Sequence, residues 1–542
     1  MKRLNLKWVN ETIGEEYKLW KKGDIITIQA QTGTGKTYFV KNTLIPYMED
    51  YEKMLIISNR KQLKRQLKKD ISELKNIKIP KTMGRLDKIS TVGNVTLLSY
   101  HQIAHLKNKE LTTGEKLNLS QYDYIVCDEC HWFKTDASFV NLTELAYKEL
   151  IKNRHMESIM IYISATMEDT KNMIESSMNK WKESGFGNYS NFKYYNYSTG
   201  IDYSYLNTMY FKKIDDIITT IKNDKTDNKW IIFVTNKTLA EDVKDKLKNY
   251  KKVGIITADT KDTNKDLKSI INESKFVSDV LICTKCLDNG VNIQDDKVKN
   301  MVVMAWDRVT FIQEVGRLRI NIENPYLVDL YICKKNKSAF RTQVKNTSIK
   351  IDIATLYYDN KDEFNNRYRN NMNKLPSELF YVKEGEGYVM NKLGYAKCLQ
   401  DNCFYNEMVD KFSKGKYKEY SFIREQLSWI GQEKEFDQLN EILEVYDDEE
   451  IDELEEQLKI IYDKKLVFLT AKDRIPLIKT IGIIDKAHSN LKKKEYTYVK
   501  NIDSLNGYLE EINSEYRIKK FETSRIENGK KKNYKQAWKL IK

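Results

Sequence analysis

Short apolar runs alternate with amphipathic stretches along the first two thirds of the chain. Continuous apolar runs predict strands at residues 25–28, 54–57, 95–98, 124–127 and 159–163. A second series follows at residues 230–234, 253–256, 279–283, 301–305 and 327–332. Amphipathic helical stretches separate these runs, and this order is typical of parallel sheets that are covered on both faces. The pattern therefore predicts two α/β lobes, one after the other.

Three other stretches differ from these lobes in residue composition. Residues 184–200 are rich in turn formers and poor in aliphatic side chains, which predicts a linker, while residues 1–22 are charged and uninformative. After about residue 350, charged helical segments dominate. Residues 433–456 hold thirteen acidic residues and one lysine. Ile451, Leu454, Leu458 and Ile461 keep a helical apolar stripe through the end of this acidic run, which we expect to be a solvated helix face.

The C-terminal tail has its own pattern. Residues 505–512 predict a helix, residues 517–526 and 533–541 predict two strands, and Asn528-Gly529 favours a tight hairpin between them. Residues 513–542 carry ten Lys/Arg and three Asp/Glu. We expect a basic, winged-helix-like module whose hairpin contacts phosphates; a frayed basic tail is the alternative. Tyr534 and Trp538 would either stack on an unpaired base or form a small core.

Composition and charge narrow the class of protein. The chain has 542 residues, 41% of them hydrophobic, and a formal net charge of +14, which permits a polyanionic partner. No apolar run approaches membrane-spanning length and no signal peptide is recognisable, so we expect a cytoplasmic, intracellular protein. Cys127/Cys130 and Cys283/Cys286 have metal-like spacing. Because Cys127 and Cys283 lie in predicted core strands, we expect no zinc or iron–sulfur site.

Residues 30–37, Ala-Gln-Thr-Gly-Thr-Gly-Lys-Thr, lie between the first predicted strand and a stretch that can begin a helix. A strand, a glycine-rich turn and a helix are the setting of a phosphate-binding loop. Gly33 and Gly35 let successive backbone N–H groups face one anion, and the helix N-terminus adds its positive dipole end. Lys36 supplies a charge for the β- and γ-phosphates, and Thr37 supplies a hydroxyl for Mg²⁺.

An acidic pair, Asp128-Glu129, follows directly after the predicted strand 124–127. At the carboxyl end of a strand and downstream of a phosphate loop, such a pair suits metal binding and water activation. We expect Asp128 to hold Mg²⁺ and Glu129 to orient and deprotonate the attacking water. Together with Lys36 and Thr37, the pair predicts a site that hydrolyses ATP.

From these residues onward the chain resembles superfamily 2 (DExH/DEAD-like) helicases and translocases, over about residues 25–335. The ordered motifs carry the resemblance: motif I at residues 30–37, Ia at 58–60, Ib at 99–102, II at 128–131, III at 164–166, IV at 233–236, V at Thr284 and 287–292, and VI at 313–319. The resemblance implies two RecA-like parallel-sheet lobes in tandem, with ATP between them and Mg²⁺ as the metal.

The resemblance also implies roles for individual residues. Those expected in catalysis are Glu129, Gln313, Arg317 and Arg319. Those expected at the nucleotide are Thr32, Gly33, Thr34, Gly35, Lys36, Thr37, Asp288 and Gly290, with Thr37 and Asp128 at the metal. Those expected at nucleic acid are Ser58, Arg60, Ser99, Thr235 and Thr284. Ser164 and Thr166 are expected to couple hydrolysis to nucleic-acid binding.

Three departures from the family pattern bear on these roles. Motif VI usually ends in an arginine three places after Arg317, where this chain has Ile320, and Arg319 stands one place earlier. Arg317 matches best the arginine that reaches the γ-phosphate, and Arg319 is the alternative. No glutamine precedes Gln29 in the manner of DEAD-box RNA helicases, and motif II ends in Cys-His. Both of these last departures point to the DExH side, where DNA translocases are frequent.

The predicted function is that of an ATP-dependent nucleic-acid helicase or translocase, acting on DNA rather than RNA. The alternatives are an ATP-gated binding switch that does not unwind, and an RNA helicase. The expected domains are residues 1–190 and 200–350 for the two lobes, 351–500 for a helical accessory region, and 501–542 for the basic tail. Nucleic acid is the expected partner, and the C-terminal region is a candidate site for a protein partner.

Overall fold

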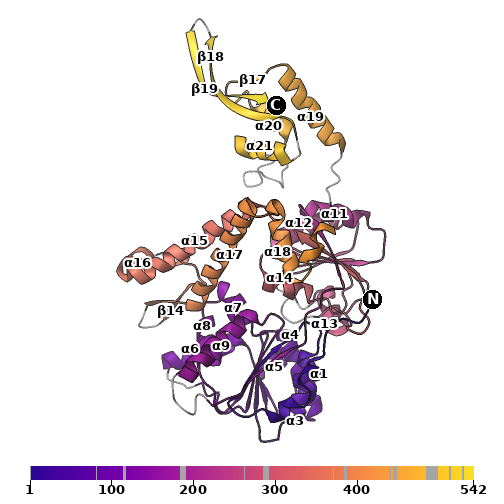
Figure 1. Ribbon diagram of the computed structural model, residues 1–542, viewed down its shortest axis with the longest axis vertical. Helices are drawn as coiled ribbons and strands as arrows, with labels where there is room; N and C mark the ends of the chain where they lie inside the picture. The colour runs from indigo at the N-terminus through magenta and orange to yellow at the C-terminus, as the bar shows by residue number, and fades with distance from the viewer. Residues whose placement is uncertain are drawn as a thin grey trace. The chain divides into compact units, whose positions relative to one another are not determined.

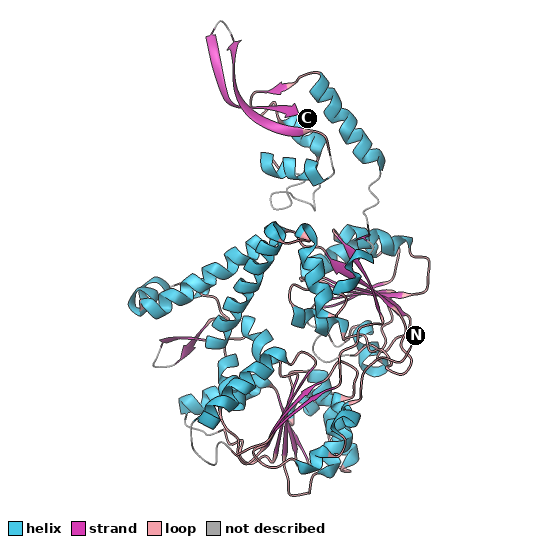
Figure 2. Ribbon diagram, in the orientation of Figure 1, coloured by secondary structure: helices cyan, strands magenta, loops and turns pink. Residues whose placement is uncertain are grey.

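The computed structural model describes residues 2–80, 82–113, 117–183, 191–261, 263–284, 292–369, 371–383, 387–438, 441–442, 448–483, 498–511, 514–527 and 530–542. The chain folds into two compact units, residues 1–443 and residues 444–542. The first unit contains two α/β lobes and a helical region, and the second is a small α+β unit (Figures 1 and 2). None of the helices in these ranges has the length and apolar character needed to cross a membrane.

Lobe 1 is built on a sheet whose seven described strands follow the order β3-β4-β2-β5-β6-β1-β7. Its strands are β1 (Ile25–Gln29), β2 (Met54–Ile57), β3 (Thr91–Val92), β4 (Val95–Leu98), β5 (Tyr124–Asp128), β6 (Ile159–Ser164) and β7 (Tyr194–Ser198). Neighbours pair in parallel except β3 and β4. In β5, Val126 packs into one hydrophobic cluster while Ile125 and Cys127 pack into another, because alternate residues face opposite sides of the sheet.

Helices cover both faces of this sheet (Figure 1). They are α1 (Val9–Ile13), α2 (Lys36–Phe39), α3 (Ile45–Tyr47), α4 (Lys61–Leu74), α5 (Met83–Lys88), α6 (Tyr100–Thr113), α7 (Trp132–Thr135), α8 (Thr143–Tyr147) and α9 (Glu168–Glu183). Shorter turns of helix are η1 (Glu16–Leu19), η2 (Val40–Leu44), η3 (Asp136–Ser138) and η4 (Lys148–Lys152). Leu67 and Ile71 of α4 pack on one side, and Tyr100 and Ile103 of α6 on the other.

Lobe 2 repeats this plan. Its seven described strands follow the order β10-β11-β9-β12-β13-β8-β16, and all neighbours pair in parallel. They are β8 (Leu206–Phe211), β9 (Lys229–Phe233), β10 (Val253–Ile256), β11 (Val280–Cys283), β12 (Val298–Val303), β13 (Val328–Cys333) and β16 (Glu441–Ile442). The helices are α11 (Ile214–Asn223), α12 (Lys237–Leu247), α13 (Lys265–Glu273) and α14 (Arg308–Val315).

All ten strands predicted from apolar runs are present, with small shifts at their ends. The prediction of a linker over residues 184–200 is wrong for its second half. Residues 194–198 form β7, which pairs with β1 at the edge of the sheet. Tyr195 and Tyr197 alternate with polar residues there, and aromatic residues favour strands even where aliphatic ones are missing. Strand β8 also escaped prediction.

A helical region follows lobe 2 and contacts both lobes. It consists of α15 (Lys337–Asp359), α16 (Lys361–Tyr368), α17 (Lys392–Lys414), α18 (Ser421–Trp429), η6 (Met372–Lys374), η7 (Lys418–Tyr420), η8 (Glu433–Gln438) and the hairpin β14 (Phe380–Lys383) with β15 (Gly387–Met390). Just before α17, Asn391 Nδ2 donates to the carbonyl of Val140 in lobe 1 (3.1 Å). In α18, Gln426 Nε2 donates to the carbonyl of Cys333 in lobe 2 (3.3 Å). The helical character was predicted; the hairpin was not.

The second unit contains α19 (Asp448–Asp463), β17 (Val467–Phe468), α20 (Ile475–Ile481), α21 (Ile502–Glu511), β18 (Arg517–Glu527) and β19 (Lys530–Ile541). Its described strands form a sheet of order β17-β19-β18. The predicted C-terminal helix and antiparallel hairpin are confirmed. The winged-helix comparison itself is not confirmed. Leu458 of the predicted apolar stripe is fully buried in this unit's core, so α19 is anchored by that stripe.

Candidate active site

The phosphate-binding loop connects β1 to α2. Gly33 and Gly35 have φ values of 94° and 88°, a conformation that glycine adopts without strain. Thr34 Oγ1 donates to the carbonyl of Gln31 (2.7 Å), which holds the loop closed. Lys36 starts α2, is 8% exposed, and donates from Nζ to the carbonyl of Ala30 (3.3 Å). The loop therefore has the shape of an anion cradle at the start of a helix.

The acidic pair lies at the carboxyl end of β5. Asp128 is the last residue of the strand, and its Oδ2 accepts a hydrogen bond from Ser58 Oγ (3.2 Å). Glu129 follows with a φ of 51°, an uncommon conformation for a residue with a side chain. Such a conformation costs about 1–3 kcal/mol and persists where the surrounding structure enforces it. Glu129 turns toward the phosphate loop, with Oε1 at 3.3 Å from Lys36 Nζ.

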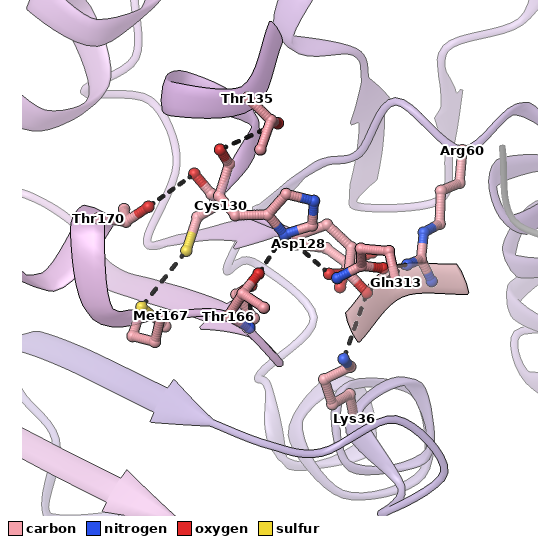
Figure 3. A network of polar contacts seen from close by, with 12 residues as sticks. Lys36, Arg60, Asp128, Cys130, Thr135, Thr166, Met167, Thr170 and Gln313 are labelled. Atoms are coloured by element: carbon pink, nitrogen blue, oxygen red, sulfur yellow. Dashed lines mark hydrogen bonds and ion pairs between the residues drawn. The ribbon is translucent and has the colours of Figure 1, made fainter. Parts of the chain in front are cut away.

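Two further side chains hold Glu129. Arg60 Nη2 lies 2.5 Å from Glu129 Oε1, and His131 Nδ1 lies 3.2 Å from Oε2. His131 Nδ1 is also 2.9 Å from Ser164 Oγ, which accepts a hydrogen bond from the backbone N–H of Thr166 (3.1 Å). Figure 3 shows this network. A contiguous chain of polar contacts therefore links Glu129 to residues 164 and 166.

Burial and charge together set the protonation of this cluster. Burial raises the pKa of Asp128, and the charge of Glu129 adds to the effect. Burial acts to raise the pKa of Glu129 as well, but the charges of Arg60 and Lys36 outweigh it and hold that pKa well below its usual range. Burial lowers the pKa of Lys36. Glu129 is therefore an ionised carboxylate at neutral pH, ready to accept a proton.

Lobe 2 brings its own residues to this cluster through α14 and the residues that follow it. A Cβ on Gly316 would lie 2.4 Å from Thr32 Oγ1, so this close approach of motif VI to the phosphate loop requires glycine. Gln313 Oε1 accepts a hydrogen bond from Arg60 Nη2 (3.4 Å). Gln313 Oε1 also accepts one from Arg317 Nη2 (2.9 Å). Hydrogen bonds thus connect the acidic pair of lobe 1 to motif VI of lobe 2.

The two motif VI arginines line different pockets. Arg317, 1% exposed, lines a pocket with Glu129, His131 and Gln313. Arg319 lines the pocket that contains Lys36, Thr37 and Asp128. The Cδ atom of Arg319 lies 4.0 Å from the position of a Cβ on Gly33, directly opposite the phosphate loop. The side chain beside the phosphate loop in this structure is therefore that of Arg319, whose Nε and Nη2 donate to Asn292 Oδ1 (3.0 and 2.7 Å), although Arg317 matches the motif better.

The pocket of Arg319 fits a triphosphate and Mg²⁺. Burial lowers the pKa of Arg319 to about 9, and the nearby charges of Arg317 and Arg60 contribute. Within the described residues, the buried Nη1 of Arg319 has no hydrogen-bond partner. Crowded, buried cations favour an anion between them, and the hydroxyl of Thr37 and the carboxylate of Asp128 line the same pocket as hard oxygen ligands of the kind that Mg²⁺ prefers.

The residues predicted to contact nucleic acid lie at strand ends in both lobes: Ser58 and Ser99 follow the paired strands β2 and β4, and Thr235 and Thr284 follow the paired strands β9 and β11. Ser58 and Arg60 are buried and point to Asp128 and Glu129 instead. Ser99 accepts at Oγ from the backbone N–H of Gln102 at the start of α6 (3.1 Å). Thr235 is exposed, and the backbone N–H of Thr284 donates to the carbonyl of Ile256 (3.2 Å). Asp288 and Gly290 lie outside the described residues.

The N-terminal segment also contributes to the site, which the sequence did not indicate. Trp8 lines the same pocket as Lys36 and Arg319, and the backbone N–H of Val9 donates to the carbonyl of Thr34 (2.9 Å). Leu4 and Leu6 pack into lobe 2, while Val9 packs into lobe 1. A single signal was available: apolar residues recur regularly in a segment otherwise rich in charge.

The predicted core positions of two cysteines are confirmed. Cys127 and Cys283 are fully buried in β5 and β11. Burial raises the pKa of Cys127 far above the range of a reactive thiol. Cys286 lies outside the described residues. Cys130, after the acidic pair, is also buried and directs its sulfur toward Met167 Sδ (3.6 Å).

In the sheet of lobe 1, the acidic pair follows β5 and the phosphate loop follows β1, with only β6 between the two strands. Arginines from a second RecA-like lobe face both features. This arrangement defines a two-lobed ATPase. Residues 5–169 match the family model described as "Type III restriction enzyme, res subunit", and residues 210–321 match "Helicase conserved C-terminal domain". The chain belongs to the superfamily 2 helicases. It is an ATP-hydrolysing nucleic-acid helicase that uses ATP with Mg²⁺.

Solved structures with some similarity include S. cerevisiae Dbp5 bound to RNA and ADP BeF3, at 19% identity over 58% of this chain and 80% of that chain, with a TM-score of 0.39. Another is the Mycobacterium smegmatis helicase Lhr bound to ssDNA and AMP-PNP, at 13% identity over 62% of this chain and 46% of that chain, also with a TM-score of 0.39. A third is a DEAD box protein from the hyperthermophile Methanococcus jannaschii, at 17% identity over 57% and 82%, with a TM-score of 0.32. Among curated proteins, none is significantly similar to this chain.

Proposed function

We propose that this helicase is a DNA translocase that hydrolyses ATP at the junction of its two lobes and moves along one strand. The observation that carries the ATP site is the position of Arg319 of lobe 2 opposite Gly33 of the phosphate loop in lobe 1. ATP bound there would contact both lobes, so binding favours their closed arrangement and hydrolysis releases it. Support for DNA comes from the match of lobe 1 to the res subunit of type III restriction enzymes.

Within this proposal, Lys36 and the loop N–H groups hold the phosphates, and Glu129 is the general base. In the structure Glu129 is held by Lys36 and Arg60. When Lys36 turns to a phosphate, Glu129 loses one of the two cations that lower its pKa, so it becomes a stronger base as the substrate arrives. Mg²⁺, held by Thr37 and Asp128, would neutralise phosphate charge.

The remaining residues then have supporting roles. Arg319 would stabilise charge that develops on the γ-phosphate, and Arg317 would hold Gln313 next to Arg60. Ser164 and Thr166 would couple ATP hydrolysis to nucleic-acid binding through His131, which contacts both Ser164 and Glu129. Ser99, Thr235 and Thr284 are proposed contacts with the translocated strand. For Ser58 and Arg60 we propose a role at the acidic pair, because both contact it.

The proposal is tested by comparing ATP turnover with single-stranded DNA, duplex DNA and single-stranded RNA, together with strand displacement from DNA substrates that have 3′ or 5′ overhangs. We expect DNA to stimulate turnover more than RNA does, and displacement in one direction only. Glu129→Gln is the control: it should bind ATP but lose turnover by about 10²–10⁴-fold, because an amide cannot accept the proton.

Each outcome has a distinct meaning. Stronger stimulation by RNA would make the chain an RNA helicase. Stimulation by DNA without displacement or directional movement would indicate an ATP-gated binding switch. Wild-type turnover by Glu129→Gln in the presence of nucleic acid would refute the assignment of the base.

A further inference from the structure

The hairpin β18–β19 of the second unit uses its two faces differently. Among the described residues, the core cluster of this unit takes Ile518, Trp538 and Leu540 from the hairpin. Ile518 is opposite Leu540 and Lys520 is opposite Trp538, so these residues share one face. Trp538 is 5% exposed and therefore belongs to the core rather than to a base-stacking surface. On the other face Lys519, Arg525 and Lys532 are exposed, whereas Ala537 and Tyr534 are buried.

That other face concentrates positive charge in pairs. Lys519 lies directly opposite Lys539, and Arg525 lies directly opposite Lys532. The register shifts between Phe521 and Thr523, where β19 has one more residue than β18. Odd-numbered residues of β18 stay on one face through this shift, so both pairs project from the same side. Like charges directly opposite each other destabilise a hairpin, and this hairpin has two such pairs on one face.

An aromatic side chain stands between the charged pairs. Phe521 is half-buried on the same face as Lys519, and Lys539 Nζ lies 5.1 Å from the centre of its ring. Tyr534 follows on β19 opposite Thr523, with Lys532 Nζ 5.3 Å from its ring, but it is 9% exposed, so Phe521 is the ring that a base can reach. Exposed cations beside a half-buried aromatic ring are suited to a strand of nucleic acid, whose phosphates contact the cations and whose bases can stack on the ring.

We propose that this surface, formed by Lys519, Phe521, Arg525, Lys532 and Lys539 and here named the hairpin face, binds single-stranded nucleic acid through its phosphate backbone. The repulsion between the paired cations is relieved when phosphates bind between them, which gives the costly arrangement a function. Lysine contacts phosphates without reading bases, so the hairpin face is indifferent to sequence. It is a second contact with nucleic acid outside the motor lobes, and it does not depend on the DNA preference proposed for them.

The test uses the full chain and two matched double variants. Lys519→Gln/Lys539→Gln removes one charged pair from the hairpin face. Lys520→Gln/Lys531→Gln removes the same charge from exposed residues of the opposite face of the same hairpin. Binding of fluorescent oligothymidylate, oligouridylate and a DNA duplex is measured without nucleotide between 50 and 200 mM salt. Circular dichroism and thermal melting establish that both variants fold.

We expect the hairpin-face variant alone to bind both single strands more weakly. Two lost phosphate contacts should reduce the slope of log affinity against log salt by about 1.4. The loss of affinity between 50 and 200 mM salt should then be about sevenfold smaller than for the wild type. Phe521→Leu should weaken single-strand binding with no change in this slope. ATP turnover without nucleic acid should be the same in all variants, because the phosphate loop and motif VI lie in the first unit.

Four results would overturn the proposal. One is an unchanged salt slope in Lys519→Gln/Lys539→Gln, and another is an equal loss in the opposite-face variant, which would reduce the effect to net charge. The third is tighter binding to the duplex than to the single strands. The fourth is displacement of the oligonucleotide by polyglutamate and other acidic polymers at equal charge, which would make the hairpin face a general polyanion surface. Failure of the motor would look different: it would alter ATP turnover and leave the salt slope intact.

Discussion

Strand β1 of lobe 1 and strand β8 of lobe 2 occupy the same place in sheets of the same strand order, yet they end differently. After β1 the chain turns through Gly33 and Gly35 at positive φ, and Lys36 begins α2. After β8 the chain passes through Lys212 and Lys213 without a glycine, and α11 begins at Ile214. One topology thus leads into a phosphate loop in one lobe and into an ordinary helix start in the other.

The start of α11 shows why lobe 2 has no place for a phosphate there. The buried carboxylate of Asp216 accepts hydrogen bonds from the backbone N–H groups of Lys212 (3.2 Å) and Lys213 (2.8 Å). A carboxylate in this position satisfies the helix N-terminus as a bound phosphate would. Lobe 2 therefore fills with its own side chain the place that lobe 1 leaves to a ligand.

A second pair of strands repeats the lesson. Strand β5 ends in Asp128, which lines the phosphate pocket, whereas the corresponding β12 leads to Asp307. Asp307 Oδ1 accepts from the backbone N–H of Thr310 (2.9 Å) and caps α14, the helix that carries Gln313 and leads to Arg317. The acid of lobe 1 faces the ligand, and the acid of lobe 2 positions a helix that faces lobe 1. Chemistry resides in the loops at strand ends, while the sheet only positions them.

The largest expected effect comes from removing the charge that distinguishes the two loops. Lys36→Ala should abolish measurable ATP turnover, because the phosphates lose the lysine at the centre of the pocket. Lys213→Ala, directly before the corresponding helix α11 in lobe 2, should leave turnover unchanged. Steady-state phosphate release with saturating nucleic acid is the measurement. Comparable losses in both variants would mean that the two loops are functionally alike and the comparison fails.

The next effect concerns the two arginines that lobe 2 sends to lobe 1. Arg319→Ala should lower ATP turnover by about 10³-fold or more, the usual value of an arginine that contacts the transferred phosphoryl group. Arg317→Ala should cost less, because its guanidinium bonds Gln313 and lines the neighbouring pocket. Nucleotide affinity, measured by fluorescence of a labelled ATP analogue, should change modestly in both. The opposite ranking of turnover would show that the motif match to Arg317 outweighs the observed geometry.

The sequence predicted the sheets and the lobe 1 part of the site, because both depend on local patterns. Continuous apolar runs mark buried parallel strands, and the residue order Gly-x-Gly-Lys-Thr carries its own geometry. The edge strand β7 was missed because tyrosines replace aliphatic residues there. The choice between Arg317 and Arg319, and the contact of Arg60 with Glu129, depend on how lobe 2 lies against lobe 1. No pattern within motif VI or motif Ia contains that information.

A smaller effect decides whether Arg60 positions Glu129 or contacts nucleic acid. Arg60→Gln should lower ATP turnover by about 10- to 100-fold, the cost of a lost hydrogen bond to a charged group. Arg60 holds the pKa of Glu129 down, so its removal lets that pKa rise. Because Glu129 must be ionised to act as the base, the acidic limb of the pH–rate profile should move to higher pH. Arg60→Lys should restore the profile in part.

Oligonucleotide affinity provides the discriminating control for Arg60. A positioning residue at Glu129 should leave binding of single strands nearly unchanged in the absence of nucleotide. Weaker binding with an unshifted pH profile would place Arg60 in the nucleic-acid groove, as the sequence predicts.

The smallest effect tests the carboxylate that occupies the helix start in lobe 2. Asp216→Asn keeps the shape of the side chain and removes its charge, so it should destabilise the first unit by about 1 kcal/mol. Because the first unit spans residues 1–443, that loss corresponds to a melting temperature about 1 °C lower. ATP affinity and a stoichiometry of one nucleotide per chain, both measured by calorimetry, should stay as in the wild type. A second nucleotide bound by Asp216→Asn would show that only this carboxylate keeps phosphate out of lobe 2, whereas an unchanged melting temperature would show that the capping contacts do not stabilise the lobe. The expected result would mean that removing the Asp216 carboxylate is not enough to create a phosphate site in lobe 2. The loop after β1 has the glycines and the lysine that a phosphate needs, and the loop after β8 lacks them.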